Sequence, residues 1–143
     1  MSVSHISVVL RRRIRERSHG LCEYCLLSEQ DCFFTHEPDH IIAEKHGGET
    51  TSENLALACF DCNRFKGTDI ASRDPKTKRL VPLFNPRIDV WDEHFKTRDG
   101  LILPLTPIGR ATERLLKLNI PARVEVRTTL ARCGCYPRTQ DAS

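Results

Sequence analysis

The sequence predicts an α+β fold in a single domain with short appendages. Its 143 residues are about the length of one domain and leave little room for a second core. Segments with helical spacing of apolar residues and segments of strand-like composition follow one another without a β-α-β pattern. Two matched Cys-x-x-Cys pairs are separated by 33 residues. A folded segment must therefore lie between the two pairs.

The N-terminal part is predicted to begin with a helix and to continue into an interrupted strand. In residues 6–19, apolar side chains recur at near-helical spacing among arginines, and Gly20 is a natural residue just after a helix. Residues 32–43 are aromatic and β-branched in character but contain Pro38, which predicts a strand broken or bulged at that point. Residues 46–54 have the composition of turns and helix caps.

The second half is predicted to hold short strands and then two helices. Apolar residues 55–58 lead into the second cysteine pair, and a short helix is expected to end at Gly67. Later strand candidates are residues 80–84 and 101–103. Thr106-Pro107 predicts the start of one helix, and Pro121 that of another helix through about Arg132. The predicted organisation is one domain over residues 1–132, with a helix (6–19), a core (20–68) and a mainly helical extension (69–132), followed by a flexible tail (133–143).

The seven cysteines include the two pairs Cys22-x-x-Cys25 and Cys59-x-x-Cys62. In a reducing compartment such pairs are more often metal ligands than disulfides, and four thiolates suit the tetrahedron of zinc. A redox role of the thioredoxin type needs only one pair and a β-α-β pattern, which is absent. A closed shell of four cysteines leaves no position for water or substrate, so we expect the zinc to be structural. The other cysteines, Cys32, Cys133 and Cys135, are expected to be a buried thiol and tail residues.

The net charge of +3 hides an uneven distribution. Residues 1–20 carry five arginines and one glutamate (+4), residues 21–60 one lysine and eight acids (−7), and residues 61–143 sixteen bases and ten acids (+6). An acidic centre between basic arms suits a site that gathers cations while its surroundings gather phosphate, although solvated helix faces would give the same arms.

No apolar run approaches the ~18 residues that a membrane span requires, so no membrane association is expected. The N-terminal arginines follow the short apolar stretch, whereas a secretory signal places its positive charge first. We therefore expect an intracellular, cytoplasmic protein.

The segment DHIIAEKHGGETTSENLALACFDCNRFKG, residues 39–67, resembles the core of an HNH endonuclease with a four-cysteine zinc site. The match consists of Asp39-His40, Asn54 fourteen residues after His40, and Asn63 nine residues further on, framed by the two cysteine pairs. It covers residues 22–67, and parts of the C-terminal half resemble the extension of compact bacterial HNH proteins. The resemblance implies a ββα-metal fold, in which a two-stranded hairpin and a helix surround one catalytic divalent cation.

The resemblance also implies a role for each matched residue. His40 corresponds to the general base that takes a proton from the attacking water, and the ordinary pKa of an imidazole, about 6.5, suits that task. Asp39 and Asn63 correspond to ligands of the catalytic cation. Asn54 corresponds to the asparagine that braces the loop and helps to hold the base. Arg64 and Lys66 are expected to contact substrate phosphates.

The chemistry of these residues narrows the choice of catalytic cation, and their adjacency raises a question about the direction of two side chains. Oxygen ligands from Asp39 and Asn63 favour Mg²⁺ or Mn²⁺. Adjacent residues of a regular strand point to opposite faces, so Asp39 and His40 need a break at Pro38 to face one site. The predicted function is metal-dependent hydrolysis of DNA, bound mainly through its phosphate backbone, to 5′ phosphate and 3′ hydroxyl ends.

Two other readings remain open from the sequence. One is a zinc-stabilised nucleic-acid-binding module that is catalytically silent; in the other, Asp39 caps a turn, His40 lies at the surface, and Asn54 and Asn63 cap helices. His46 is expected to face solvent at a turn, and His94 to pack in the core. Three arginines of the last helix are expected to line a nucleic-acid surface or to face water, namely Arg123, Arg127 and Arg132.

Overall fold

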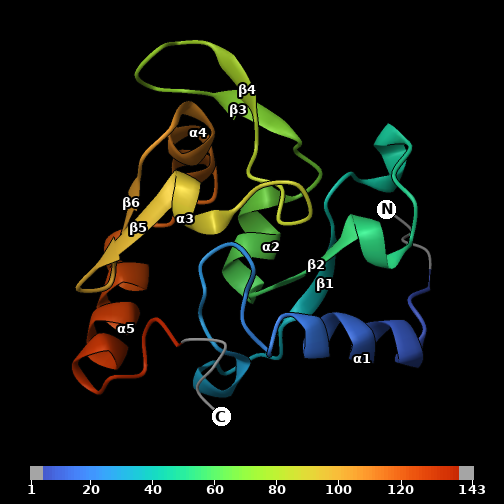
Figure 1. Cartoon of the computed structure of the whole chain (residues 1–143), viewed down its shortest axis with the longest axis horizontal. Coiled ribbons are helices and arrows are strands. Elements are labelled where there is room, and N and C mark those ends of the chain that lie inside the picture. Colours follow the sequence, from blue (N-terminus) through green and yellow to red (C-terminus); the bar gives the residue numbers. More distant parts are fainter. Residues whose placement is uncertain (1–4, 139–143) are drawn as a thin grey trace.

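A computed structural model describes residues 5–138 and has an α+β architecture, as predicted (Figure 1). The helices of the described residues are α1 (Val8–Arg17), α2 (Phe60–Lys66), α3 (Trp91–His94), α4 (Pro107–Leu115) and α5 (Pro121–Arg132). The strands are β1 (Glu37–His40), β2 (Leu55–Ala58), β3 (Ala71–Arg73), β4 (Leu80–Pro82), β5 (Phe95–Arg98) and β6 (Leu101–Pro104). Single 3₁₀ turns are η1 (Glu29–Asp31), η2 (Glu44–His46) and η3 (Ser52–Asn54). Within the described range, no helix has the length and apolar character needed to cross a membrane.

The helix boundaries follow from local chemistry that the sequence displays. Ser7 caps α1, where its hydroxyl accepts a hydrogen bond from the Leu10 amide at 3.1 Å. Thr106 caps α4 in the same way, accepting from the Gly109 amide at 3.0 Å, with proline at the first helical position. The predicted start of α5 at Pro121 and its end at Arg132 are confirmed.

The strands form three separate antiparallel hairpins, β1–β2, β3–β4 and β5–β6. Figure 1 shows α2 at the centre of the molecule, with β1–β2 and α1 to one side and β5–β6, α4 and α5 to the other. The β3–β4 hairpin projects beside α4. The hairpin β1–β2 and the following α2 give the ββα arrangement around which the rest of the chain is built.

The prediction of a break at Pro38 is wrong. Pro38 pairs with Leu57 in an uninterrupted register that runs from Glu37 opposite Ala58 to His40 opposite Leu55. In an antiparallel pair, every second residue of a strand directs its backbone nitrogen toward the partner strand. Ile41 N donates to Asn54 O, so the odd-numbered positions of β1 face β2 in this way. Position 38 therefore directs its nitrogen away from β2. Since β1 is an edge strand, proline costs no ladder bond there.

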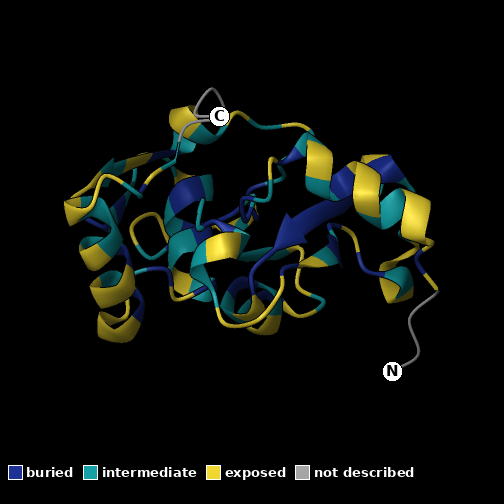
Figure 2. Ribbon diagram, turned by 90° about the horizontal axis from the view of Figure 1, so that it is seen from below, coloured by how far each residue is buried: buried dark blue, intermediate teal, exposed yellow. Residues whose placement is uncertain are grey.

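The two faces of β1–β2 pack against different cores. Leu55 and Leu57 are fully buried with Ile14 of α1, and α1 turns its opposite flank to solvent (Figure 2). Ala56 and Ala58 face a larger core that holds the paired cysteines and extends into the C-terminal half. The strand β2, buried at every residue, therefore separates the two cores.

Candidate functional site

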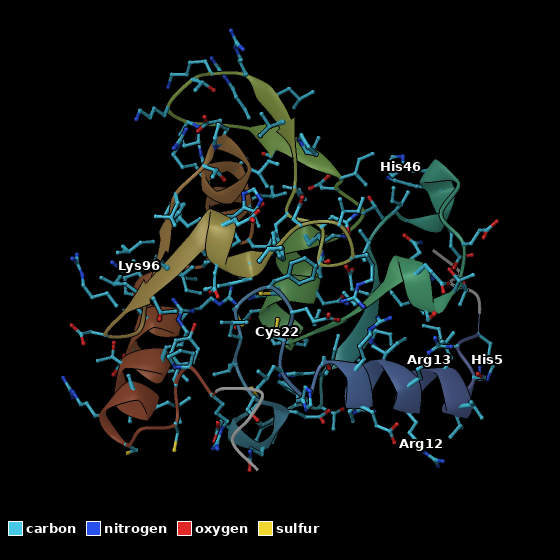
Figure 3. All side chains as sticks on the ribbon, viewed as in Figure 1. His5, Arg12, Arg13, Cys22, His46 and Lys96 are labelled. Carbon is cyan, nitrogen blue, oxygen red and sulfur yellow. The ribbon has the colours of Figure 1, made fainter. Side chains whose placement is uncertain are left out.

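The four paired cysteines meet in the larger core. The sulfur atoms of Cys22, Cys25, Cys59 and Cys62 lie within 4.8 Å of one another, and all four residues are buried. Figure 3 places Cys22 at the centre of the molecule beside α2. Hydrogen bonds among these thiols, first that with Cys22, lower the pKa of Cys25. Burial raises the pKa of Cys22 and of Cys62. The convergence of four buried sulfurs within this distance is what fits a tetrahedral structural zinc ion.

A buried arginine lies against this sulfur cluster. Arg123 of α5 is 7% exposed, and its Nη2 is 3.0 Å from Cys62 Sγ and 3.6 Å from Cys59 Sγ. Its Nη1 donates to Leu116 O at 2.6 Å. Burial alone would lower the pKa of Arg123. The adjacent cysteines, Cys62 foremost, have the larger opposite effect, so the pKa of Arg123 is raised. The guanidinium therefore offsets the negative charge of the thiolates and joins α5 to the cluster.

The expectation that the arginines of α5 lie at the surface is wrong for two of the three. Arg123 and Arg127 are buried, and only Arg132 is exposed. Arg127 donates from Nε to Gly100 O at 2.8 Å and from Nη2 to Leu118 O at 2.5 Å. Backbone carbonyl groups that lie at turns and at a helix end thus accept the hydrogen bonds that water would otherwise accept from both guanidinium groups.

His40 is the last residue of β1 and is held by the loop that follows. Its Nε2 is 2.9 Å from the Thr50 hydroxyl and 3.7 Å from Glu44 Oε1. The side chain of His40 is 10% exposed, so part of the ring reaches the surface. The imidazole is thus fixed through one ring nitrogen.

Asn54 braces the same loop. Its amide group donates to Ile42 O at 2.9 Å and to Glu49 O at 2.8 Å, and its Oδ1 accepts from Ile42 N at 2.9 Å. Gly48 lies so close that a β-carbon would stand 1.7 Å from Ile42 O. Only glycine fits at that position, so Asn54 and Gly48 together determine the path from His40 to Thr50.

Asp39 is buried on the other side of β1. Its Oδ2 accepts from the Tyr24 hydroxyl at 2.9 Å and lies 3.1 Å from Lys66 Nζ. Burial raises the pKa of Asp39, while Lys66 and then Tyr24 act in the opposite direction. Both contacts fall on Oδ2, so Oδ1 is the oxygen that a cation would take.

Lys66, at the end of α2, joins the two halves of the candidate site. Its ammonium group is 3.1 Å from Asp39 Oδ2 and donates to His40 O at 3.0 Å. The residue is 1% exposed, so its ammonium group lies inside the protein and not at the surface. Arg64, two residues earlier on α2, is exposed and pairs with Asp61 at 3.1 Å.

Asn63 lies in the middle of α2 and is half-buried. Among residues 5–138, no partner forms a hydrogen bond with its side chain, so its amide oxygen is available as a ligand. Its backbone is fully engaged, since Asn63 N donates to Cys59 O at 2.9 Å and Gly67 N donates to Asn63 O at 3.0 Å. The cysteine pair thereby fixes the turn of helix that carries Asn63.

The structure brings Asp39, Lys66 and α2 together and directs the His40 ring elsewhere. His40 pairs with Leu55, whose face of the hairpin packs on α1, whereas Asp39 pairs with Ala56 and faces α2. Lys66 is the link between them, because it contacts the Asp39 side chain and the His40 main chain.

Two further histidines lie where the sequence predicted. His46 is exposed at the tip of the loop after β1, far from Cys22 in Figure 3. His94 packs against the Phe84 ring and contacts the Thr106 hydroxyl through Nδ1 at 2.6 Å.

Three residues of the site were not predicted from the sequence, namely Tyr24, Gly48 and Thr50, and Arg123 was predicted to lie at the surface. The signal for Gly48 was present, because a Gly-Gly pair in a loop indicates a backbone position that tolerates no side chain. Tyr24, Thr50 and Arg123 lie 15, 10 and 61 residues from the partners that they contact, and no local sequence pattern indicates such contacts.

The family model of HNH endonucleases matches residues 22–69. This segment is about a third of the chain and contains both cysteine pairs, β1, β2 and α2. The predicted resemblance is therefore confirmed for this segment. No curated protein and no solved structure matches the chain.

Proposed function

We propose that the protein is a metal-dependent endonuclease that hydrolyses DNA phosphodiester bonds. The observation that carries this proposal is a fixed, partly exposed imidazole inside a segment that matches HNH endonucleases. His40 stands at the end of β1, Thr50 holds one ring nitrogen, and Asn54 braces the connecting loop. Such immobilisation is what a general base requires.

The proposed proton acceptor is Nδ1 of His40. Thr50 Oγ1 and the Glu44 carboxylate both lie on the Nε2 side of the ring, and their oxygen atoms favour a proton on Nε2. The neutral ring then presents an unprotonated Nδ1. In the proposed reaction this nitrogen takes a proton from water, the water oxygen bonds to phosphorus, and the bond from phosphorus to the 3′ oxygen breaks. The departing 3′ oxygen takes up a proton from solvent, and His40 returns its own proton to solvent, so the products are a 5′ phosphate and a 3′ hydroxyl.

Asp39 and Asn63 are the residues proposed to hold the divalent cation. Asp39 Oδ1 and the free amide oxygen of Asn63 are hard ligands, which suit Mg²⁺ or Mn²⁺. When bound, such an ion supplies positive charge against the developing charge on phosphate and on the departing oxygen. Lys66 and Tyr24 orient the Asp39 carboxylate, and the cysteine cluster, with its proposed zinc, holds the turn of α2 that carries Asn63.

DNA is proposed to bind mainly through its backbone. Arg64 is exposed one residue after Asn63 and is the first candidate for a phosphate contact. Lys66 was also predicted to contact phosphate, but its burial favours a positioning role at Asp39.

A catalytically silent DNA-binding module is the second candidate. It is favoured by two observations. The Lys66 ammonium occupies the Asp39 carboxylate and would repel a cation placed beside it. The unbroken register of β1 also turns the Asp39 and His40 side chains to opposite faces of the hairpin. In that case the segment would keep its fold and its cysteine cluster without cleaving DNA.

Supercoiled plasmid distinguishes the two candidates. Wild-type protein and Asn63→Ala are incubated with plasmid in Mg²⁺, in Mn²⁺ and in EDTA, and DNA binding is measured in parallel. Endonuclease activity predicts metal-dependent nicking with 5′ phosphate ends and a large loss in Asn63→Ala. Binding by the wild type without nicking in either metal would establish the silent module instead.

A further inference from the structure

Three neighbouring phenylalanines are exposed on the side of the molecule that carries η1 and the start of α2. Phe33 is 96% exposed, Phe34 54% and Phe60 53%. Single exposed apolar residues are ordinary, but three aromatic rings in contact form a patch that indicates a binding surface. The patch lies outside the groups assigned above to water activation and cation binding.

The rings are arranged in an ordered series. Phe34 stacks on Phe60 with centroids 4.9 Å apart and an interplanar angle of 29°. Phe33 meets Phe34 edge to face at 5.1 Å. The series therefore connects the loop after η1 to the first turn of α2 and leaves the faces of Phe33 largely open.

Cationic side chains continue the same series along α2. The Arg64 guanidinium lies 5.6 Å from the Phe60 centroid and 4.4 Å from that of Phe65. Lys117 Nζ also lies over the Phe65 ring, 4.9 Å from its centroid. The series thus runs from three rings at the η1 loop and the start of α2, through Arg64 and Phe65, to Lys117 in the turn after α4. Flat aromatic faces beside cations are the groups that bind the bases and phosphates of single-stranded nucleic acid.

A cavity of about 460 Å³ opens beside the aromatic rings, between the η1 loop, the start of α2 and α5. Phe33, Phe34 and Phe60 line one part, and Ala122 and Val126 of α5 line another. Its volume is within the range of about 300–1,000 Å³ that is usual for small-molecule sites, so it accommodates a base turned out of a strand.

Two acids in this cavity have cationic partners. Asp31 accepts two hydrogen bonds from Arg138, at 3.0 and 3.2 Å. Asp61 pairs with Arg64 at 3.1 Å and lies 3.9 Å from Arg123. Because both carboxylates are paired, they oppose the approach of a phosphate backbone less than free acids would.

We propose that the aromatic surface formed by Phe33, Phe34 and Phe60 binds unpaired bases of single-stranded nucleic acid. Phe60 and Asn63 are three residues apart on α2 and therefore share one helix face. A base stacked on Phe60 would place its strand beside the candidate cation ligand. The proposal rests on the proposed function, because the proximity of Phe60 to Asn63 matters only if Asn63 binds the catalytic cation. It deepens that function by naming strands with unpaired bases as the preferred substrate class.

The test compares binding of a short fluorescein-labelled oligothymidylate with binding of a duplex of equal length, by fluorescence anisotropy. The buffer contains neither Mg²⁺, Mn²⁺ nor chelator, so that cleavage does not interfere and any zinc is kept. Phe33→Ala/Phe34→Ala removes two rings, Phe33→Leu/Phe34→Leu keeps apolar bulk without a flat face, and Phe33→Tyr/Phe34→Tyr keeps the rings. Leu80→Ala is the control, because Leu80 is 76% exposed on β4. Thermal unfolding and zinc content establish that each variant is folded.

Stacking predicts that the alanine and leucine variants bind oligothymidylate at least about fivefold more weakly than the wild type. The tyrosine variant and Leu80→Ala should bind it as the wild type does, and duplex binding should be unchanged in all variants. Unaltered oligothymidylate binding by the alanine variant would overturn the proposal. So would full binding by the leucine variant, which would indicate an apolar protein partner, or no oligothymidylate binding by the wild type.

This outcome is separate from that of the plasmid assay. Ring-dependent binding of oligothymidylate by a protein that cuts no plasmid would support the aromatic surface and would remove the nuclease assignment. Plasmid cleavage without ring-dependent binding would support the nuclease assignment and would remove the aromatic surface.

Discussion

The contact between Asp39 and Lys66 is the most deeply buried ion pair of the candidate site. The side chains are 6% and 2% exposed, and they connect β1 to the end of α2. Removing one member of a buried pair leaves an uncompensated charge, whereas replacing both with apolar groups is often tolerated. The exposed pair of Arg64 and Asp61 on the same helix offers a contrast, because its side chains are 56% and 41% exposed.

Lys66→Met is predicted to lower the free energy of unfolding by about 3–5 kcal/mol, because Asp39 then stays buried without its cation. Arg64→Ala, the matched control, should change it by less than about 1 kcal/mol. Asp39→Leu/Lys66→Met should recover most of the loss. Urea unfolding followed by circular dichroism measures all three, and equal effects of Lys66→Met and Arg64→Ala would contradict the assignment of a buried pair.

Single residues were predictable from the sequence where residue type and sequence spacing determine their chemistry. The four cysteines converge as expected because two Cys-x-x-Cys turns can each present two sulfurs to one ion. The burial of Lys66 could not be predicted, because a lysine near the end of a short helix ordinarily faces water. Only the distant placement of Tyr24 and Asp39 creates the polar pocket that its ammonium group enters.

Among the elements, the β3–β4 hairpin depends on a polar contact rather than on an apolar core. Asp74, which is fully buried, accepts from Arg110 of α4 at 2.9 and 3.1 Å. It also accepts from the amides of Lys76 and Thr77 in the turn of the hairpin. One carboxylate thus closes the turn and attaches it to α4.

Asp74→Asn is predicted to destabilise the protein at neutral pH and to have less effect in acid. The Arg110 guanidinium, more than any other neighbour, holds the pKa of Asp74 well below its usual range. Because the folded-state pKa is lowered, the stabilisation is complete above the unfolded-state pKa, about 3.9, and is lost as the pH falls below it. The difference in melting temperature between wild type and Asp74→Asn should therefore be largest above about pH 5 and should narrow below about pH 4.

The control for this prediction is Asp69→Asn, because Asp69 is exposed just before the same hairpin. Its melting temperature should follow that of the wild type at every pH. A constant difference between wild type and Asp74→Asn from pH 7 to pH 3 would contradict the role of the Asp74 carboxylate.

Element boundaries were predictable where caps and prolines set them, as for α4 and α5. Pro38 was misjudged because the meaning of a strand proline depends on whether its nitrogen faces a neighbouring strand. The sequence does not show that β1 is an edge strand paired on one side only. The arginines of α5 were misjudged for a related reason, since carbonyl groups of other elements surround them.

For the molecule as a whole, the cysteine cluster joins the segment of residues 22–69 to the C-terminal half. The larger core contains the four cysteines together with Phe84, Phe95 and Leu116 from the later elements. Trp91 Nε1 donates to Tyr24 O in the first cysteine turn at 2.9 Å. Tyr136, in the segment predicted to begin a flexible tail, is buried and donates to Cys25 O at 2.7 Å. Residues 139–143 of that tail lie outside the described residues.

Removal of zinc is therefore predicted to unfold both halves together. Metal binding supplies several kcal/mol of folding free energy, so a strong chelator should lower the melting temperature by at least ~10 °C. Trp91, the only tryptophan, should shift its emission to the red at the same chelator concentration that reduces the helical circular dichroism signal. An unchanged Trp91 signal after complete zinc release would contradict a shared core. Re-addition of zinc should restore both signals.

Comparison of His40→Ala with His46→Ala is the sharpest test of the proposal that His40 serves as the base in metal-dependent DNA cleavage. The rate of nicking of supercoiled plasmid in Mg²⁺ or Mn²⁺ is measured for both variants and for the wild type. His46 is exposed at the tip of the same loop and controls for changes in charge and loop composition. General-base catalysis predicts a loss of at least ~100-fold in His40→Ala and less than about a twofold change in His46→Ala. Nicking by His40→Ala at the wild-type rate would exclude His40 as the general base.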